Sequence, residues 1–402
     1  MKKNIIILSN AVPGSNKYFE DWLKDEIELT HMNYESITIF PKKYNSEDIN
    51  LPFNCKVINF QNFNIKKLNL LELINCFKIV FTDLLAYSSL FKFFSSFRYN
   101  FSLIKSLHVK AKKIASEQGL IQEDTIIYAY WAGDLATTAC IIKQYYKNCK
   151  VVTRGHGFEI FEEQTRDNLI PFRKFQYKFL DKLFADSKKG LRHLNNRNKH
   201  QHINDISYVG SKDCGIGLFD SDFQFTIVTC SFIREIKRLH LMSNILKHIS
   251  FDLLWHVIGE GPDMDLIIEK NKILPSNITV VYHGRKSRDE VLEFYKENHV
   301  NLFVSLSSSE GLPVSMIEAI SFGIPIMSTN VGGCDEICNE NTGFLIPSNF
   351  DGKTVANQIE KFKGSSKNNI VFRNKCREFW KLNFEAKINY MAFKNKICNL
   401  LK

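Results

Sequence analysis

The sequence predicts an α/β protein made of two doubly wound, Rossmann-like domains, and three observations support this prediction. The chain has 402 residues, more than one hydrophobic core usually supports. Apolar segments of strand length alternate with segments of helical periodicity in both halves, which is typical of βαβ units in parallel sheets. No internal repeat with a period of about 20 to 50 residues is evident, which argues against solenoids and propellers.

The first half begins with a short apolar run, Ile5 to Leu8, that we interpret as a buried strand. It follows two lysines and is too short for the apolar region of a signal peptide or for a membrane span. The next strands and helices are expected in TIIYAYW, LATTACIIKQYY, KVVT, KLFAD and KKGLRHL. We therefore expect an N-terminal, acceptor-side domain over residues 1–207.

The second half repeats the alternation in FTIVTCSF, LLWHVIG, ITVVYHG, VNLFVSLS, IPIMST and GFLIP. Glycines 210, 215 and 217 cluster with turn-forming residues just before it, so an interdomain linker is expected over 208–222. The second domain is expected over 223–380. Apolar residues at helical spacing after this point predict a closing C-terminal helix over 381–402.

The stretch from Leu68 to Lys113 is rich in Phe, Leu and Lys and allows two interpretations. It forms either a helical insertion packed on the sheet or an amphipathic face that lies on a membrane surface. Asp83 and Lys92 interrupt its most apolar part, so we expect no bilayer-spanning helix there. The expected location is the cytoplasm, either free or peripheral at the inner face of the cell membrane.

The formal net charge of +10 favours anionic partners, which could be nucleotides, lipid phosphates or nucleic acid. The sequence has neither an aromatic-interleaved RNA-binding signature nor a helix-turn-helix pattern, so nucleic acid is not expected. The ten cysteines form no CxxC pair, and we interpret them as reduced core residues. Cys334 and Cys338 lie four residues apart, but no nearby histidine or cysteine completes a zinc set, so no metal site is expected.

The most informative segment runs from Asn301 to Gly333. A strand, Leu302 to Ser305, leads through serines to a turn at Glu310 and Gly311, and Pro313 follows where a helix can begin. The free N–H groups of that helix would face the end of a parallel sheet, which is a favourable place for a phosphate.

Glu318 lies in the second turn of this expected helix, among apolar residues. A carboxylate in such surroundings must be paired or hydrogen-bonded. Two ribose hydroxyls would satisfy both of its oxygens. A buried lysine or backbone amides are the alternative partners.

Glu310 and Glu318, with seven residues between them, lie in the segment EGLPVSMIEAISFGIPIMSTNVGG. This segment closely resembles the signature of retaining GT-B glycosyltransferases of glycosyltransferase family 4. The resemblance is to the polysaccharide and cell-surface glycan type of that family in particular. The resemblance covers most of the C-terminal half and includes VIGEGPDMDLI, YHGRKSRDEVLEFY and TGFLIP. It implies a GT-B fold, with two domains facing each other across a cleft. It also implies a hexosyltransferase-like enzyme that transfers a sugar, with retention, from a nucleotide diphosphate donor.

The resemblance assigns roles to the residues of these motifs. Glu310 would contact the hydroxyls of the donor sugar, Glu318 the ribose, and the amides of Gly311 and Leu312 the diphosphate. Arg285 would lie near the nucleobase. The implied donor-binding set is Gly261, Arg238, Arg285, Gly311, Leu312, Pro313 and Glu318.

The family also holds the diphosphate with an arginine and a lysine five residues apart. Lys237 matches the lysine, whereas Phe232 occupies the place of the arginine. Arg234 or Arg238 could supply the second cation, and a surface position is the alternative for Lys237. No DxD motif appears where a metal-dependent enzyme would want one, so the expected reaction needs no divalent ion and no cofactor.

The N-terminal half resembles the family more loosely. VVTRGHGFEIFEE is similar to an RxHGxD segment, with Glu159 in the place of the aspartate. His156 would face the donor sugar, and a histidine that caps a loop is the alternative. The implied catalytic residues are His156, Arg234, Lys237 and Glu310, and the implied acceptor-side residues are Gly14, Ser15, Asp134 and Arg154.

Two other classes of function fit the same sequence. A nucleotide-sugar epimerase or a phosphorylase can use this fold, and Phe232 would suit a non-catalytic nucleotide-binding relative. A plain NAD-dependent enzyme is disfavoured because SNAVPGS, and not GxGxxG, follows the first strand. The expected partners are a nucleotide sugar donor and a glycan or lipid-linked acceptor, and neither the sugar nor the base is specified by the sequence.

Overall fold

The computed structural model describes residues 3–13, 20–44, 51–59, 67–84, 90–117, 119–165, 168–197 and 200–401, with residues 84 and 90–95 described by their backbone alone. The chain divides into two compact units. The first comprises Met1–Tyr208 with Tyr390–Lys402, and the second comprises Val209–Asn389. Within the described ranges, every helix is too short or too polar to traverse a bilayer.

The first unit is built on a seven-stranded parallel sheet in the order β3-β2-β1-β4-β5-β6-β7. The order reverses between β1 and β4, which is the hallmark of a doubly wound sheet. Its central strands β4 and β5 are almost entirely buried, as expected where helices cover both sides. The strands are β1 (Lys3–Ala11), β2 (Tyr34–Lys43), β3 (Cys55–Val57), β4 (Thr125–Ala129), β5 (Lys150–Gly155), β6 (Lys182–Ala185) and β7 (Asn204–Ile206).

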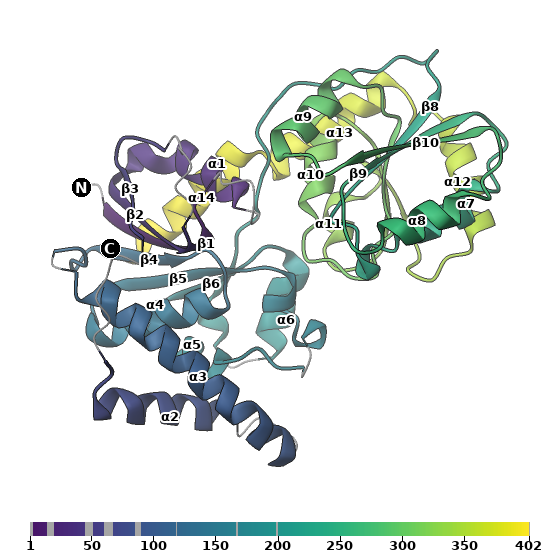
Figure 1. The fold of residues 1–402 in the computed structure, drawn as a ribbon. Helices are drawn as coiled ribbons and strands as arrows, with labels where there is room; N and C mark the ends of the chain where they lie inside the picture. The colour runs from purple at the N-terminus through teal and green to yellow at the C-terminus, as the bar shows by residue number, and fades with distance from the viewer. Residues whose placement is uncertain are drawn as a thin grey trace. The chain divides into compact units, whose positions relative to one another are not determined.

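Helices cover this sheet on both faces (Figure 1). On one face α4 packs on the sheet, α3 on α4 and α2 on α3, around buried Ile104, Leu107 and Val80. On the other face α14 places Phe393 and Ile397 against the sheet. The helices of this unit are α1 (Asp21–Thr30), α2 (Leu70–Leu84), α3 (Leu90–Ala115), α4 (Asp134–Tyr145), α5 (Arg173–Phe179), α6 (Lys188–Arg197) and α14 (Ala386–Cys398).

The second unit is built on a six-stranded parallel sheet in the order β10-β9-β8-β11-β12-β13. Its order reverses between β8 and β11, so the loops after these two strands meet at the switch point where such sheets bind ligands. The strands are β8 (Phe225–Cys230), β9 (Leu253–Ile258), β10 (Ile278–Gly284), β11 (Leu302–Ser305), β12 (Ile326–Thr329) and β13 (Gly343–Ile346).

Seven helices of the second unit follow its strands or close its chain: α7 (Met242–Leu246), α8 (Met264–Asn271), α9 (Arg288–Glu297), α10 (Val314–Ser321), α11 (Cys334–Ile337), α12 (Gly352–Lys363) and α13 (Ile370–Asn383). The core between the sheet and α7, α8 and α12 contains the fully buried Trp255 together with Ile227 and Leu302. The predicted fold class, two doubly wound α/β domains, is thus confirmed.

Residues 207–224, all described, form no named helix or strand and include the whole of the expected linker, 208–222. From Val209 onward this segment belongs to the second unit. The Ser211 amide donates to the Phe384 carbonyl at 3.1 Å, and the Gly217 amide donates to the Phe322 carbonyl at 2.9 Å. The segment expected as one closing helix contains the end of α13, a break at Phe384 and Glu385, and then α14.

Candidate functional site

The loops that follow β8, β9, β11 and β12 are bonded to one another at the carboxyl end of the second sheet. The Ser308 amide donates to the Ile236 carbonyl at 2.8 Å, which joins the loops after β11 and β8. The Gly333 amide donates to the Gly311 carbonyl at 2.7 Å, which joins the loops after β12 and β11. This network fixes the backbone around Glu310, at the topological switch point.

Lys237 and Glu310 form the ion pair of this site. Lys237 ends the short helix η6 (Glu235–Lys237), and its Nζ lies 2.6 Å from Glu310 Oε1. The Ser307 hydroxyl donates to the same oxygen at 2.5 Å. Both recorded bonds end on Oε1, so within the described residues Glu310 Oε2 is left to accept from a ligand hydroxyl. The structure therefore brings together two of the four predicted catalytic residues.

The amides of Gly311 and Leu312 lie beside this pair, just before α10. Within the described part of the chain, neither amide donates a hydrogen bond. Pro313 is the N-cap residue of α10, so the partial positive charge of the helix N-terminus adds to these donors. Two unpaired N–H groups next to a lysine make a favourable position for an anion.

Gly332 permits the close packing of these loops. Its φ is 54°, in the left-handed region, and a Cβ atom there would lie 1.9 Å from the Glu310 carbonyl oxygen. Gly261 acts similarly in the loop after β9, where a Cβ atom would lie 1.9 Å from the Ile233 carbonyl oxygen. Gly261 was predicted to bind the donor. In the structure its lack of a side chain lets the loops after β8 and β9 approach each other.

Arg238 and Arg234, the two candidates for the second cation, differ in their surroundings. The Arg238 guanidinium donates to the carbonyls of Leu306, Ser348 and Ser307 at 2.7, 3.0 and 3.1 Å. All three of its nitrogens are used in this way, so we assign it the role of holding the loops. Arg234 is exposed, and among the described residues its side chain has no recorded partner.

Glu318 is buried on α10 and is paired within the protein. Arg288, the first residue of α9, donates from Nε to Glu318 Oε1 at 2.7 Å. Burial, with the Glu318 charge nearby, raises the pKa of the Cys230 thiol to about 12, so that thiol stays protonated. Sequence reasoning predicted that Glu318 needs a partner but missed Arg288. The one sequence feature that pointed toward Arg288 is the capping box formed by Ser287 and Glu290, which marks where α9 begins.

Phe232 follows the central strand β8, and Arg285 follows the edge strand β10. Phe232, which occupies the expected position of an arginine, is 49% exposed. Arg285 follows β10, and its NH1 lies 3.5 Å from Glu260 Oε1 in a pair of exposed side chains. Such exposed pairs contribute little to stability.

His156 follows β5 in the first unit. Its Nδ1 lies 3.3 Å from Asp186 Oδ2, and its ring lies 4.8 Å from the Trp131 ring, centroid to centroid. Its Nε2 is buried and lacks a hydrogen-bond partner among the described residues, so a ligand hydroxyl would satisfy it. Glu159 accepts from the His156 amide, and burial raises the Glu159 pKa to about 7 against the opposing effect of His156.

Arg154 does not lie where an acceptor could reach it. Its side chain is fully buried, its NH1 donates to Glu26 at 2.8 Å, and its guanidinium lies 4.3 Å from the centre of the Phe393 ring. These contacts tie β5 to α1 and α14. The predicted acceptor-side role of Arg154 is therefore replaced by a structural one, because a ligand would have to displace part of the core.

Asp134, the first residue of α4, remains accessible. Its Oδ2 lies 3.1 Å from Lys42 Nζ, and it lines a small pocket with Lys42 and Lys110. Burial, together with the nearby Lys42 charge, lowers the Lys110 pKa, although Asp134 opposes this effect. The pocket thus has an excess of positive charge. Gly14 and Ser15, the other two acceptor-side predictions, lie outside the described residues.

A family model matches most of the second unit. Residues 220–379 match the family model described as Glycosyl transferases group 1. The chain is similar to the O-antigen biosynthesis glycosyltransferase WbnH of Escherichia coli, with 29% identity over 133 residues, which are 33% of this chain and 36% of WbnH. It is also similar to the N-acetyl-alpha-D-glucosaminyl L-malate synthase of Bacillus anthracis, with 25% identity over 260 residues, which are 60% of this chain and 65% of that enzyme.

Solved structures resemble the whole chain. Anabaena HepE, in complex with UDP and glucose, superposes with a TM-score of 0.68 at 14% identity, covering 99% of this chain and 100% of HepE. TarM superposes with a TM-score of 0.72 at 14% identity, covering 99% of each chain. The chain therefore has the GT-B fold, and its second unit contains the stretch, 220–379, that is similar to group 1 glycosyl transferases.

The close approach at Gly332 can be tested against a matched glycine. We predict that Gly332→Ala lowers the free energy of unfolding by about 1–3 kcal/mol more than Gly284→Ala, because Glu310 must move. Gly284 also has a positive φ, of 65°, but its Cβ would meet no atom within 4 Å. Urea unfolding of both variants measures the difference, and equal losses would show that the loops can separate without cost.

Proposed function

We propose that this chain is a retaining glycosyltransferase of family 4 that transfers a hexose-like sugar from a nucleoside diphosphate to a glycan or lipid-linked acceptor in the assembly of a cell-surface polysaccharide. The match of residues 220–379 to the group 1 family supports the reaction class. Relatives named for O-antigen, colanic acid and capsular polysaccharide biosynthesis support the type of product. The observation that carries the proposal is the pair of unbonded amides, at Gly311 and Leu312, beside Lys237.

The charges of the site suit departure of a diphosphate. Breaking the bond between the sugar and its nucleotide places negative charge on the leaving phosphate. Lys237, the two amides and the N-terminus of α10 would stabilise this charge without a divalent ion, with exposed Arg234 as an additional cation. Because these groups are held by the loop network before substrate arrives, little reorganisation is needed in the transition state.

Glu310 and Glu318 would hold the two sugars of the donor. Glu310 Oε2 would accept from a hydroxyl of the transferred sugar, while Lys237 and Ser307 keep its Oε1 in place. Glu318 would accept from the ribose hydroxyls, and its pair with Arg288 fixes the direction of the carboxylate. Carboxylates suit both tasks because each oxygen can accept more than one hydrogen bond.

The first unit would supply the acceptor side. The charges of Lys42 and Lys110 beside this small pocket would attract an acceptor that carries phosphate, and Asp134 can accept from an acceptor hydroxyl. The proposal retains His156 as a catalytic residue, since its buried Nε2 needs a polar partner from the substrate.

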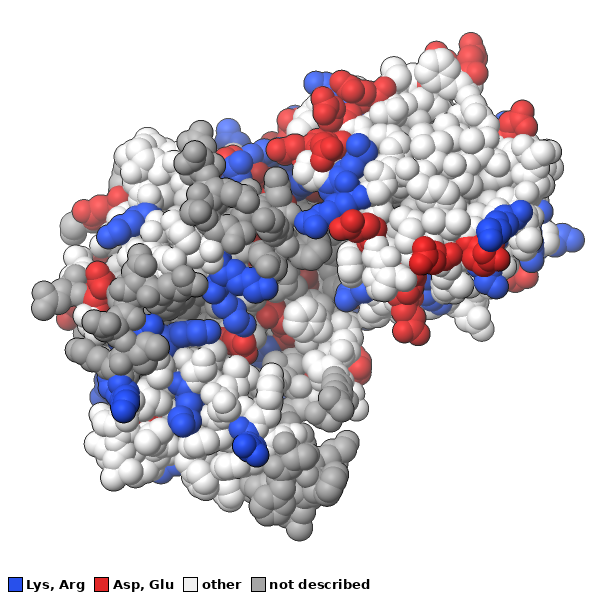
Figure 2. Space-filling view, in the orientation of Figure 1, with Lys and Arg blue, Asp and Glu red and all other residues white. Residues whose placement is uncertain are grey.

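Membrane contact through α2 is part of this proposal. Apolar side chains are exposed on α2 at helical spacing, at Leu70, Leu71, Ile74, Phe77 and Phe81. Basic side chains are visible in Figure 2 over the helices of the same unit, with few acidic ones among them. Exposed Lys78 lies on the same helix. An apolar helix face next to lysines suits the surface of an anionic bilayer, where a lipid-linked acceptor would be found.

The function is tested most simply at Lys237. A thermal-shift screen of nucleotide sugars selects a donor, and release of nucleoside diphosphate on addition of an acceptor lipid extract then reports transfer. We predict that Lys237→Ala lowers turnover about a hundredfold, equivalent to about 2.7 kcal/mol of transition-state stabilisation, because one preorganised charge is lost. Lys247→Ala, at an exposed lysine of the same domain, is the matched control and should retain full turnover.

Two results would contradict this proposal. Near-normal turnover in Lys237→Ala would remove this lysine from the site. Saturable nucleotide binding without release of nucleoside diphosphate, whatever the acceptor, would indicate a protein that only binds nucleotides.

Membrane contact is tested by co-sedimentation with vesicles that contain about 30% anionic lipid, a fraction chosen to give a negative surface potential. We predict that the double substitution Leu71→Asp and Phe77→Asp releases most of the bound protein, because charged groups are costly below the headgroups. Leu382→Asp is the matched control: Leu382 on α13 is 79% exposed, similar to Leu71 at 77%. Equal release by both variants would mean that α2 does not bind the vesicles.

A further inference from the structure

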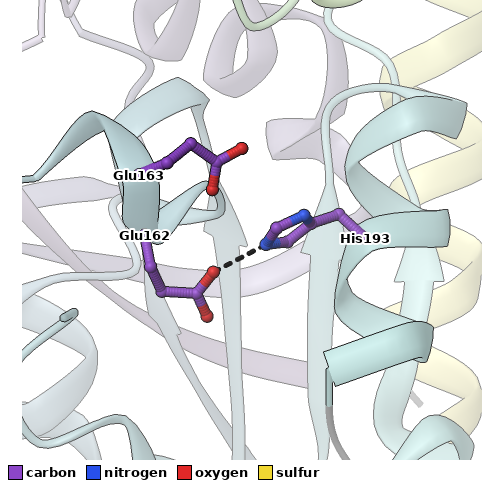
Figure 3. Close-up of side chains that lie close together, drawn as sticks. All are labelled: Glu162, Glu163 and His193. Atoms are coloured by element: carbon purple, nitrogen blue, oxygen red, sulfur yellow. Dashed lines mark hydrogen bonds and ion pairs between the residues drawn. The ribbon is translucent and has the colours of Figure 1, made fainter. Parts of the chain in front are cut away.

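A group of three potential metal ligands lies in the first unit, apart from the residues discussed above. Glu162 and Glu163 belong to the short helix η4 (Glu162–Gln164), and His193 belongs to α6. One ligand atom from each of the three side chains lies within 4.8 Å of the other two. Figure 3 shows both carboxylates and the imidazole turned toward one another across the gap between these helices.

The backbone and the surrounding side chains hold these groups in place. Glu162 Oε2 lies 2.6 Å from His193 Nε2. The buried Phe161 ring packs against the His193 ring with 4.9 Å between centroids, which limits rotation of the imidazole. Thr165 bonds the Glu162 carbonyl through both its amide, at 2.9 Å, and its hydroxyl, at 2.7 Å. The turn that presents the carboxylates is therefore fixed.

The donor set indicates which ion would bind. One imidazole nitrogen and two carboxylate oxygens are typical ligands of Zn²⁺, whereas Mg²⁺ and Ca²⁺ prefer oxygen ligands alone. Zn²⁺ bonds of about 2.0–2.2 Å place tetrahedral ligand atoms about 3.3–3.6 Å apart. To reach this spacing, the distance between Glu162 Oε2 and His193 Nε2, now 2.6 Å, would increase by roughly 1 Å. Ligand atoms that are now up to 4.8 Å apart would move closer together by roughly 1 Å. Side-chain rotation alone can supply such movements.

We propose that Glu162, Glu163 and His193 bind Zn²⁺ and that the ion ties η4 to α6. His156 lies just before η3 (Gly157–Glu159), which leads to η4, and Asp186 lies just before α6. An ion that joins η4 to α6 would therefore also hold together the two segments whose residues His156 and Asp186 are in contact. The site would thus stabilise the first unit and the orientation of His156. It is separate from the leaving-group site at Lys237, for which no metal is proposed.

Calorimetric titration of the full chain with ZnCl₂ tests the proposal. We expect the wild-type chain to bind Zn²⁺ and His193→Asn to bind at least about tenfold more weakly, because a direct ligand is lost. Zn²⁺ should also raise the thermal midpoint of the wild-type chain, and Mg²⁺ should not. His248→Asn, at an exposed histidine of the second unit, is the matched control and should behave as wild type.

A second variant keeps the result interpretable. Glu162→Gln with Glu163→Gln removes both anionic ligands while retaining their size, and it should lose Zn²⁺ binding even if His193→Asn folds poorly. Zn²⁺ affinity and thermal shift unchanged in either folded variant, or absence of Zn²⁺ binding to the wild-type chain, would overturn the proposal.

Discussion

The ion pair of Lys237 and Glu310 is the interaction on which the candidate site depends. At 2.6 Å it joins the loops after β8 and β11, the two strands between which the order of the second sheet reverses. Gly332 and Arg238 then fix the backbone around the pair, so the unbonded amides of Gly311 and Leu312 stay close to the lysine. Positive charge and N–H donors are thereby concentrated at one point, before any anion arrives.

The fold and the position of the site could be predicted from local patterns. The expected strand from Leu302 to Ser305 is β11, and Pro313 is the N-cap residue directly before α10. Both features are specified by neighbouring residues: an apolar run gives a buried strand, and proline suits the start of a helix. The alternation of strands and helices likewise predicted two doubly wound sheets, since parallel strands need such crossovers.

The partners of buried charges could not be predicted in this way. Glu318 is paired with Arg288, thirty residues earlier in the chain, and Arg154 on β5 is paired with Glu26 on α1. Such pairs depend on how α9 packs beside α10 and α1 beside β5, which no local spacing reveals. The same holds for Arg238, whose three carbonyl partners come from two loops, and for His193, which meets Glu162 only because α6 lies beside η4.

The structure of the chain crystallised with UDP, the nucleotide bound in the related HepE structure, tests the central claim most directly. The account predicts that the diphosphate lies within hydrogen-bonding distance of the Gly311 and Leu312 amides and of Lys237 Nζ, with the ribose hydroxyls on Glu318. A nucleotide bound elsewhere in the second unit, or one whose diphosphate contacts neither the amides nor the lysine, would contradict it.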